Sequence, residues 1–305
     1  MDKAARRVGS AGMMFTHKLG LAAVCALAGS LVFAGWAVAQ SPTKPDTETV
    51  APTSETETPE PDRQTWSFAG PFGAFDRAQL QRGYQVYREV CSTCHSMQFV
   101  AFRNLSDPGG PQFSTSQVKA LAATFQIDDL NDAGDPIKRP GRPSDYIPWN
   151  FANPRAARAA LGGALPPDMS LLAKARSYER GFPRFVGDIV TQYQEEGPDY
   201  IVSLMGGYRD PPKGVTLGAT QYYNLYFPGH KIGMPAPLED GRVAYTDGSP
   251  QTVKQYALDV AAFLEWVAEP KLEERKVIGF RVIVFLIVFA GLLYFVKKKV
   301  WADAH

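Results

Sequence analysis

The residues best suited to chemistry stand together in the stretch "CSTCH", where Cys91 and Cys94 are two residues apart and His95 follows directly. Three classes of protein use a Cys-x-x-Cys pair: thiol redox proteins, zinc proteins and proteins with covalently attached haem. A structural zinc site needs four protein ligands, so this chain would have to recruit His230 or a carboxylate. Thioredoxin-like chemistry places the pair near a βαβ unit, and the sequence contains no visible unit of that kind.

Covalent haem attachment is the interpretation that uses all three residues of the motif. The two thiols add to the vinyl groups of the porphyrin, and the adjacent histidine becomes an axial ligand of the iron. The sequence therefore predicts one covalently bound haem c, attached at Cys91 and Cys94, with His95 on the iron.

Five residues are candidates for the opposite side of the iron: Met97, Met169, Met205, Met234 and His230. Met97 is too close to His95 in the chain to reach the other face of the haem. Met169 and Met205 lie in segments that look helical, where methionine usually fills the core. Met234 stands in "KIGMPAPL", between a glycine and a proline, and such a rigid segment favours it over His230.

The two ends of the chain have the composition of targeting and membrane segments. Residues 1–39 combine early basic residues, an apolar run and a terminal Ala-Val-Ala, which predicts a signal peptide. An apolar run at 277–296, followed by three lysines, predicts a transmembrane anchor within 276–305. Both patterns place the intervening chain outside a bacterial inner membrane, in the periplasm, with the C-terminus in the cytoplasm.

The part between these ends divides into a leader and a domain. Residues 41–63 hold six acidic and two basic side chains among many Thr and Pro residues, so we expect 40–64 to be a disordered acidic leader. A spacer role is favoured over electrostatic steering of a partner, because exposed charges are screened within about 10 Å at ordinary salt. Residues 65–275 then form the periplasmic domain.

Helical periodicity is clear in two stretches of the domain. Residues 76–90 open with Asp76 as the expected N-cap, and apolar residues recur along one face. The second stretch ends near 269, with Ser249 as the expected N-cap and Pro250 at the first helical position. A further helix is expected around 168–178. Gly- and Pro-rich segments separate these elements, and no alternating strands are visible, so the fold class is mainly α.

Four long stretches in this order resemble cytochrome c1, the haem subunit of the cytochrome bc1 complex, in its bacterial form. They are "RGYQVYREVCSTCHSM", "NPRAARAALGGALPPDMSLLAKAR", "YYNLYFPGHKIGMPAPL" and "DVAAFLEWVAEPK", and the resemblance runs from about Trp66 to Trp301. It implies a domain like a class I c-type cytochrome with long irregular insertions and one C-terminal transmembrane helix.

The resemblance also implies roles for single residues. Cys91 and Cys94 match the thioether positions, and His95 and Met234 match the axial ligands of the iron. Two further residues match family positions near the haem propionates: Arg176 and Tyr200. An arginine suits a propionate because it stays charged and can pair bidentately.

The chain also departs from the family pattern. Leu161 stands where many relatives have an asparagine near a propionate, so that hydrogen bond is expected to be absent or replaced. Residues 177–197 are longer than in mitochondrial members and are expected to form a surface insertion.

The function implied is a one-electron relay. The chain is expected to be an electron carrier by itself, within a ubiquinol–cytochrome c reductase that contains cytochrome b and a Rieske iron–sulfur protein. The resemblance to the family implies that this complex is dimeric. It would take electrons from the Rieske protein and pass them to a soluble c-type cytochrome. Two alternatives stay open: a membrane-anchored cytochrome that feeds a terminal oxidase directly, and a haem peroxidase or sensor. No nucleic-acid partner is indicated.

Overall fold

The computed structural model describes residues 58–176, 181–191 and 193–302, all within one unit of the chain, Pro52–His305. The predicted signal peptide and most of the predicted leader lie outside the described residues. The helices are α1 (Arg77–Glu89), α2 (Thr115–Ala123), α3 (Pro154–Ala160), α4 (Leu172–Ala175), α5 (Arg184–Thr191), α6 (Glu196–Gly206), α7 (Val253–Ala268) and α8 (Leu272–Val300), with 3-10 turns η1 (Cys91–Thr93) and η2 (Phe102–Ser106). The strands are β1 (Gln126–Leu130), β2 (Pro136–Pro140), β3 (Tyr222–Tyr223) and β4 (Lys231–Ile232).

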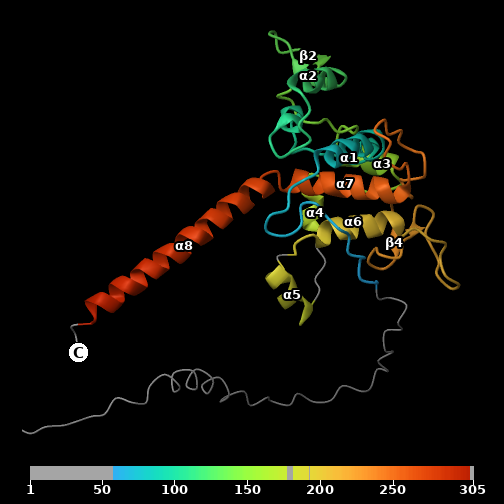
Figure 1. Cartoon of the computed structure of the whole chain (residues 1–305). Helices are drawn as coiled ribbons and strands as arrows, with labels where there is room; N and C mark the ends of the chain where they lie inside the picture. The colour runs from blue at the N-terminus through green and yellow to red at the C-terminus, as the bar shows by residue number, and fades with distance from the viewer. Residues whose placement is uncertain (1–57, 177–180, 192, 303–305) are drawn as a thin grey trace, which may run out of the picture. The chain divides into compact units, whose positions relative to one another are not determined.

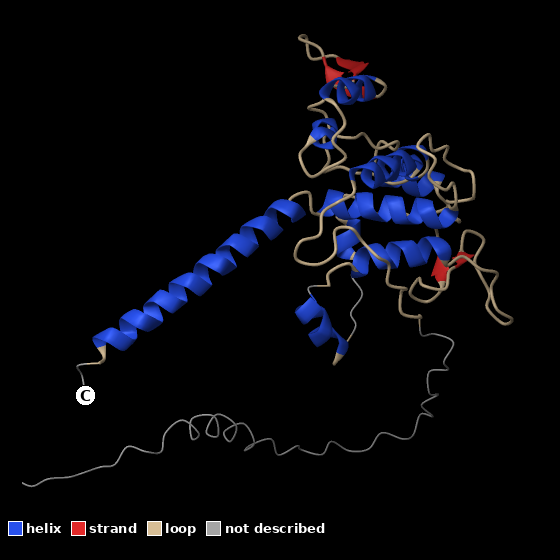
Figure 2. Ribbon diagram, in the orientation of Figure 1, coloured by secondary structure: helices blue, strands red, loops and turns tan. Residues whose placement is uncertain are grey.

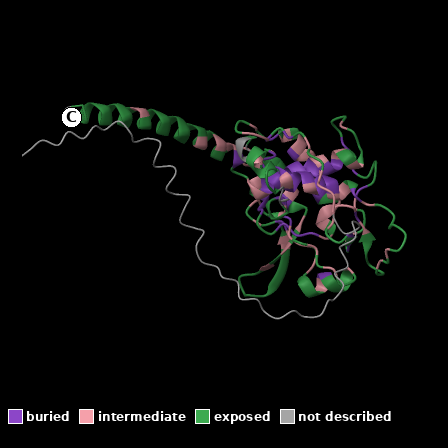
Figure 3. Cartoon of the chain, turned by 90° about the horizontal axis from the view of Figure 1, so that it is seen from below, coloured by how far each residue is buried: buried purple, intermediate pink, exposed green. Residues whose placement is uncertain are grey.

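The prediction of a mainly helical domain is confirmed. Helix α7 lies between α1 on one side and α6 on the other, and the short helix α4 contacts both α6 and α7 (Figures 1 and 2). Between Tyr256 and Val267 every residue of α7 except Leu258 is buried, as expected of a helix with neighbours on several faces. Figure 3 shows the buried residues gathered in the helical part of the domain. The core is therefore built around α7.

Helices α1 and α7 approach each other closely at one glycine. A Cβ placed on Gly83 would lie 2.1 Å from the backbone oxygen of Asp259 and 2.6 Å from Cβ of Phe263. Next to this contact, the guanidinium of Arg82 donates to both carboxylate oxygens of Asp259, at 2.9 and 3.1 Å. Asp259 is fully buried and also accepts from the hydroxyl of Tyr245 at 2.8 Å. The absence of a side chain at residue 83 is what lets the two backbones come this near.

The predicted start of α1 is confirmed, and the predicted start of α7 is wrong. Asp76 caps α1 by accepting from the backbone N–H of Ala78 and Gln79. Helix α7 begins at Val253 with Thr252 as its N-cap, whereas the hydroxyl and N–H of Ser249 bind Asp247. A carboxylate two residues upstream therefore holds Ser249 in a turn and removes it as a cap.

The helix expected at 168–178 is present only as α4, four residues long. Its expected first residue, Asp168, is instead bonded to the segment after the Cys-x-x-Cys motif, accepting from Ser96 Oγ at 2.7 Å and Gln98 N at 2.9 Å. Of the stretch 177–197, residues 177–180 and 192 lie outside the described residues. The described part forms α5 and leads into α6.

A β-hairpin at 126–140 was not expected from the sequence. Strands β1 and β2 pair antiparallel, with Gln126 opposite Pro140. None of its strand residues is buried and seven of the ten are exposed, so no alternation of apolar and polar residues marks it. Charge pairs across the strands, Asp128 with Lys138 at 2.7 Å and Asp129 with Arg139 at 2.5 Å, mark the pairing instead.

The folded contacts begin before residue 65. The backbone N–H of Asp62 donates to Ser203 Oγ at 3.1 Å, and that of Gln64 donates to Asp199 Oδ1 at 3.0 Å. Both acceptors belong to α6. The last residues assigned to the leader are thus part of the packing of the domain.

Helix α8 contains the predicted span and is the one helix, among the described residues, that is long and apolar enough to cross a membrane. Its first turn belongs to the domain, because Leu272 is buried and Glu273 accepts from Arg77 at 2.7 Å and from the N–H of Phe75 at 2.8 Å. The apolar side chains beyond Lys276 are exposed.

Replacing Gly83 by alanine should destabilise the domain, although alanine favours helices, because the new methyl group would overlap the backbone of α7. We expect the free energy of unfolding to fall by about 1–3 kcal/mol, the range for overpacked cores. Denaturant unfolding of the wild type and the variant measures this loss. Gly206→Ala is the matched control, since nothing lies within 4 Å of a Cβ there. Equal stability of Gly83→Ala and Gly206→Ala would contradict the close crossing.

Candidate functional site

A cavity of about 330 Å³ brings together the residues that the sequence favoured for the site, although the rival candidates Met97 and His230 do not line it. Its lining is mostly apolar and includes Cys91, Cys94, His95, Leu161, Arg176, Tyr200 and Met234. These residues come from η1 and its C-terminal end, the segment after α3, the end of α4, helix α6 and the loop after β4. Val260 and Leu264 of α7 complete the lining. Segments as far apart in the sequence as Cys91 and Leu264 thus meet around one space.

The motif is held in place by its own backbone and by two side chains from residues 149 and 150. The N–H of His95 donates to Cys91 O at 2.9 Å, so the five residues form a tight turn. The indole N–H of Trp149 donates to Cys94 O at 2.9 Å, and the amide of Asn150 donates to Ser92 O at 2.8 Å. The sequence had given no signal for Trp149 or Asn150, whose contact with the motif is a product of the fold.

The imidazole of His95 has one nitrogen committed and one available. Its Nδ1 lies 2.8 Å from the carbonyl oxygen of Pro167. A carbonyl can only accept, so Nδ1 carries the proton and Nε2 keeps a lone pair. Burial lowers the pKa of His95, against smaller opposing effects of Pro167 and Asp168. The ring is therefore neutral and oriented as a metal ligand requires.

Neither cysteine of the motif has the environment of a reactive thiol. Both thiols are free, and burial raises the pKa of Cys91 to about 12 and also raises that of Cys94. Thiol redox proteins instead lower the pKa of their attacking cysteine. The cavity thus disfavours a role for these cysteines as reactive thiolates.

Met234 and His230, the two rivals for the second axial position, lie in different places. Met234 lines the cavity, and its carbonyl accepts a hydrogen bond from the hydroxyl of Tyr208 at 3.1 Å. His230 is buried, is not among the residues that line this cavity, and its ring stacks on Tyr223. Its Nδ1 lies 3.2 Å from the carbonyl oxygen of Asn224. His230 therefore supports the loop that carries Met234.

Met169 and Met205 also line the cavity. Met169 lies next to His95, because its backbone N–H donates to the carbonyl oxygen of Ser96 at 2.8 Å. Met205 belongs to α6 and is partly buried against the core.

Arg176 and Tyr200 lie on the same cavity, with Arg176 exposed and Tyr200 half-buried. Burial raises the pKa of Tyr200, and the positive charge of Arg176 opposes that rise. The two side chains therefore offer one positive charge and one hydroxyl to a ligand in the cavity. Leu161 contributes only apolar surface to the same lining.

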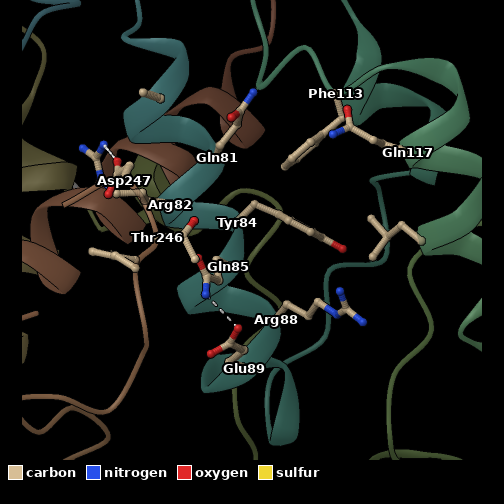
Figure 4. A pocket seen from close by; sticks show the side chains of 13 residues that line it. Gln81, Arg82, Tyr84, Gln85, Arg88, Glu89, Phe113, Gln117, Thr246 and Asp247 are labelled. Carbon is tan, nitrogen blue, oxygen red and sulfur yellow. Dashed lines mark hydrogen bonds and ion pairs between the residues drawn. The ribbon is translucent and has the colours of Figure 1, made fainter. Parts of the chain in front are cut away.

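A second, more open cleft of about 540 Å³ lies between α1, α2 and the turn at 245–247 (Figure 4). Three of its polar side chains are bonded within the protein: Gln81 donates to Pro111 O, Gln85 to Glu89 and Arg82 to Asp247. None of the residues that the sequence favoured for the site lines this cleft. The candidate functional site is therefore the cavity lined by the Cys-x-x-Cys-His motif.

A mainly helical domain with Cys-x-x-Cys-His on the wall of an apolar cavity has the features of a c-type cytochrome. The comparisons with known proteins are more specific. The sequence model described as the cytochrome C1 family matches residues 66–304. The cytochrome c1 of Blastochloris viridis is 51% identical over 79% of this chain and 86% of its own length, and that of Rhodospirillum rubrum is 44% identical over 79% and 87%.

A protein named cytochrome b/c1 from Bradyrhizobium diazoefficiens is 60% identical over 80% of this chain, and the match spans 36% of that longer protein. The chain belongs to the cytochrome c1 family. Members of this family are the haem-bearing electron-transfer subunit of the cytochrome bc1 complex. Its cofactor is a covalently bound c-type haem. The residues around the cavity fit this group: two thiols, a neutral imidazole, a thioether and a cationic side chain face an apolar space.

Asp168, which the sequence did not single out, is expected to hold the histidine side of the cavity. Burial raises its pKa, but hydrogen bonds from Ser170, Ser96 and Gln98 outweigh this effect and lower the pKa overall. Its stabilising effect is therefore fully present above the pKa of an unfolded aspartate, about 4, and is lost as the pH falls through the folded pKa. Asp168→Asn should lower the free energy of unfolding at pH 7 by about 1–3 kcal/mol.

Unfolding measured at pH 7 and again below pH 4 checks this expectation, and the gap between wild type and variant should narrow at the lower pH. Asp210→Asn, at an exposed site, is the control. A gap that stays constant with pH would show that the carboxylate charge of Asp168 does not stabilise the fold.

Proposed function

We propose that this chain transfers single electrons from a Rieske iron–sulfur protein to a soluble c-type cytochrome within a ubiquinol–cytochrome c reductase. The observation that carries the proposal is the cavity that gathers the Cys-x-x-Cys-His motif and Met234. The bound haem supplies one redox-active iron that takes up and releases one electron. Quinol chemistry belongs to the partner subunits, so the chain is an electron carrier by itself.

Cys91 and Cys94 are the proposed thioether positions, and His95 the proposed first axial ligand. The hydrogen bond from Nδ1 to Pro167 O supports this role of His95, because it fixes the ring and leaves Nε2 free. A carbonyl that accepts this hydrogen bond also raises the basicity of the ligand nitrogen.

Met234 is the proposed second axial ligand. Its position on the cavity supports it, and the hydrogen bond from Tyr208 to its carbonyl fixes the loop. His230 is disfavoured because it is not among the residues that line the cavity. Met169 is disfavoured because its backbone N–H is bonded to Ser96 O, on the His95 side of the cavity. A thioether in this position suits a high-potential carrier.

Arg176 and Tyr200 are the proposed partners of the haem propionates. The location of both on the cavity supports this, and the guanidinium can pair with a carboxylate bidentately. Leu161 provides no hydrogen bond there.

The proposed setting is a bacterial inner membrane, with 65–275 in the periplasm and the C-terminus in the cytoplasm. Cytochrome b and the Rieske protein are the proposed partners, in a complex that we propose is dimeric. The three lysines after the apolar run of α8 support this orientation. The proposed signal peptide 1–39 and the leader would act as an export signal and a spacer.

Replacing Met234 by leucine should leave the haem attached through both cysteines but lower its reduction potential, because thioether ligation favours reduced iron. The rate of electron transfer from the Rieske protein should fall together with the potential. A redox titration and an absorption spectrum of the purified complex measure both. Met205→Leu is the matched control, a thioether loss elsewhere on the same cavity, and it should keep the wild-type potential. The opposite pattern would make Met205 the ligand.

Mild solubilisation of the membranes tests which partner proteins bind this chain. Co-purification of cytochrome b and the Rieske protein with this chain is the expected result. A terminal oxidase as the main partner would instead establish a membrane-anchored cytochrome that feeds an oxidase directly. Tight binding of carbon monoxide to the native protein would indicate a displaceable sixth ligand, as a peroxidase or sensor needs.

Ending the chain after Lys276 should release a water-soluble domain with its haem, its spectrum and nearly its full potential, since all proposed ligands precede the cut. Quinol-to-cytochrome activity should fall, because the anchor keeps the domain at high local concentration beside its donor. A chain ending after Glu274 is the control. It loses the contacts of Arg275 with Glu269 and of Lys276 with Phe68 O, both 2.5 Å, and should unfold at a lower temperature. Loss of haem from both forms would mean that the span itself supports the haem domain.

A further inference from the structure

The turn at residues 69–73, Ala-Gly-Pro-Phe-Gly, presents a large apolar side chain to the outside. Phe72 is 75% exposed, whereas the neighbouring rings of Trp66, Phe68 and Phe75 are each at most 5% exposed. Those three rings pack on one another, with centroids 5.1 and 4.9 Å apart. The turn therefore directs one of four aromatic rings away from the core.

The backbone of this turn is held in one shape. Gly73 N donates to Gly70 O at 3.4 Å, and Ala74 N donates to Ser67 O at 3.0 Å. Gly70 has a φ of +70°, and a Cβ on Gly73 would lie 2.1 Å from Ala69 O. Both glycines are needed for the conformation, so the outward position of Phe72 follows from the backbone.

The turn is also bound to the first residues of α8. Lys276 Nζ donates to Phe68 O at 2.5 Å, and Glu273 accepts from the N–H of Phe75 at 2.8 Å. The same carboxylate pairs with Arg77 at 2.7 Å. These bonds on both sides of Phe72 fix the turn relative to the point where the apolar run of α8 begins.

Phe72 lies against a residue of that run. Its ring is 5.4 Å from the ring of Phe280, edge to face at 70°. The apolar run begins at Val277, so Phe280 is about 5 Å further along the helix at a rise of about 1.5 Å per residue. In a membrane crossed by α8, this is the depth of the headgroups, where aromatic side chains gather.

We propose that the 69–73 turn is a second membrane contact, with Phe72 inserted at the boundary between the lipid headgroups and acyl chains of the bilayer that α8 crosses. The inference rests on α8 being the anchor, and it is independent of the electron donor and acceptor. Residues 69–75 carry no charge, and the contact between Phe72 and Phe280 makes their surface continuous with the span. A helix alone leaves the domain free to tilt, and this second point limits the tilt and height of the haem cavity above the membrane.

A spin label at residue 72 tests the proposal. The full-length haem protein with Phe72→Cys and Cys25→Ser is labelled and placed in phosphatidylcholine–phosphatidylglycerol vesicles. Power saturation then compares collisions with oxygen, which enters lipid, and with a water-soluble nickel chelate. The matched controls are Phe99→Cys, an equally apolar side chain 68% exposed on the domain, and Leu286→Cys within the span. Haem content and the absorption spectrum verify that each variant is folded.

The oxygen-to-nickel accessibility ratio at 72 should be severalfold above that at 99 and below that at 286. It should stay raised in the purified complex in the same vesicles. A ratio equal to that at 99 would overturn the proposal. A second outcome would also overturn the proposal: the label is accessible to the nickel chelate in the isolated chain but is shielded from both reagents in the complex. A protein partner would then cover Phe72.

Discussion

The close crossing of α1 and α7 at Gly83 is the constraint on which the rest of this structure depends. Helix α1 ends directly before the Cys-x-x-Cys-His motif, and α7 supplies Val260 and Leu264 to the wall of the same cavity. Where the two backbones touch, the buried pair of Arg82 and Asp259 holds them in one register. Because desolvation offsets much of the attraction in a buried pair, we expect this pair to fix the register of the two helices more than to stabilise the fold.

The cavity has two sides that are stabilised in different ways. On the histidine side, Pro167 and Asp168 bind the motif through backbone and side-chain hydrogen bonds, so the ring of His95 has a fixed direction. On the other side, Met234 belongs to a loop that depends on Tyr208 and on the buried histidine at 230. An electron carrier benefits from such rigidity, because a site that does not rearrange on changing charge lowers the barrier to transfer.

The junction of the domain with α8 is more than a flexible link. Glu273, Arg275 and Lys276 each bind a group of the domain, so the first turn of the helix is fixed to the fold that carries the haem. The exposed Phe72 lies at this same junction. A few polar contacts therefore join the first turn of α8 to the domain.

The sequence by itself determined the chemistry and the main elements: the motif at 91–95, the helix capped by Asp76, the long apolar run and the nomination of Met234. Each of these depends on neighbours a few residues away, which a linear pattern records. Only the tertiary structure decided where α7 starts, the hairpin at 126–140, the roles of Asp168 and Tyr208, and the separation of Met234 from His230. These features depend on contacts that a linear pattern does not record. Thr252 rather than Ser249 caps α7, because Asp247 binds Ser249. A side chain lines the cavity only where the packing of other helices leaves room for it.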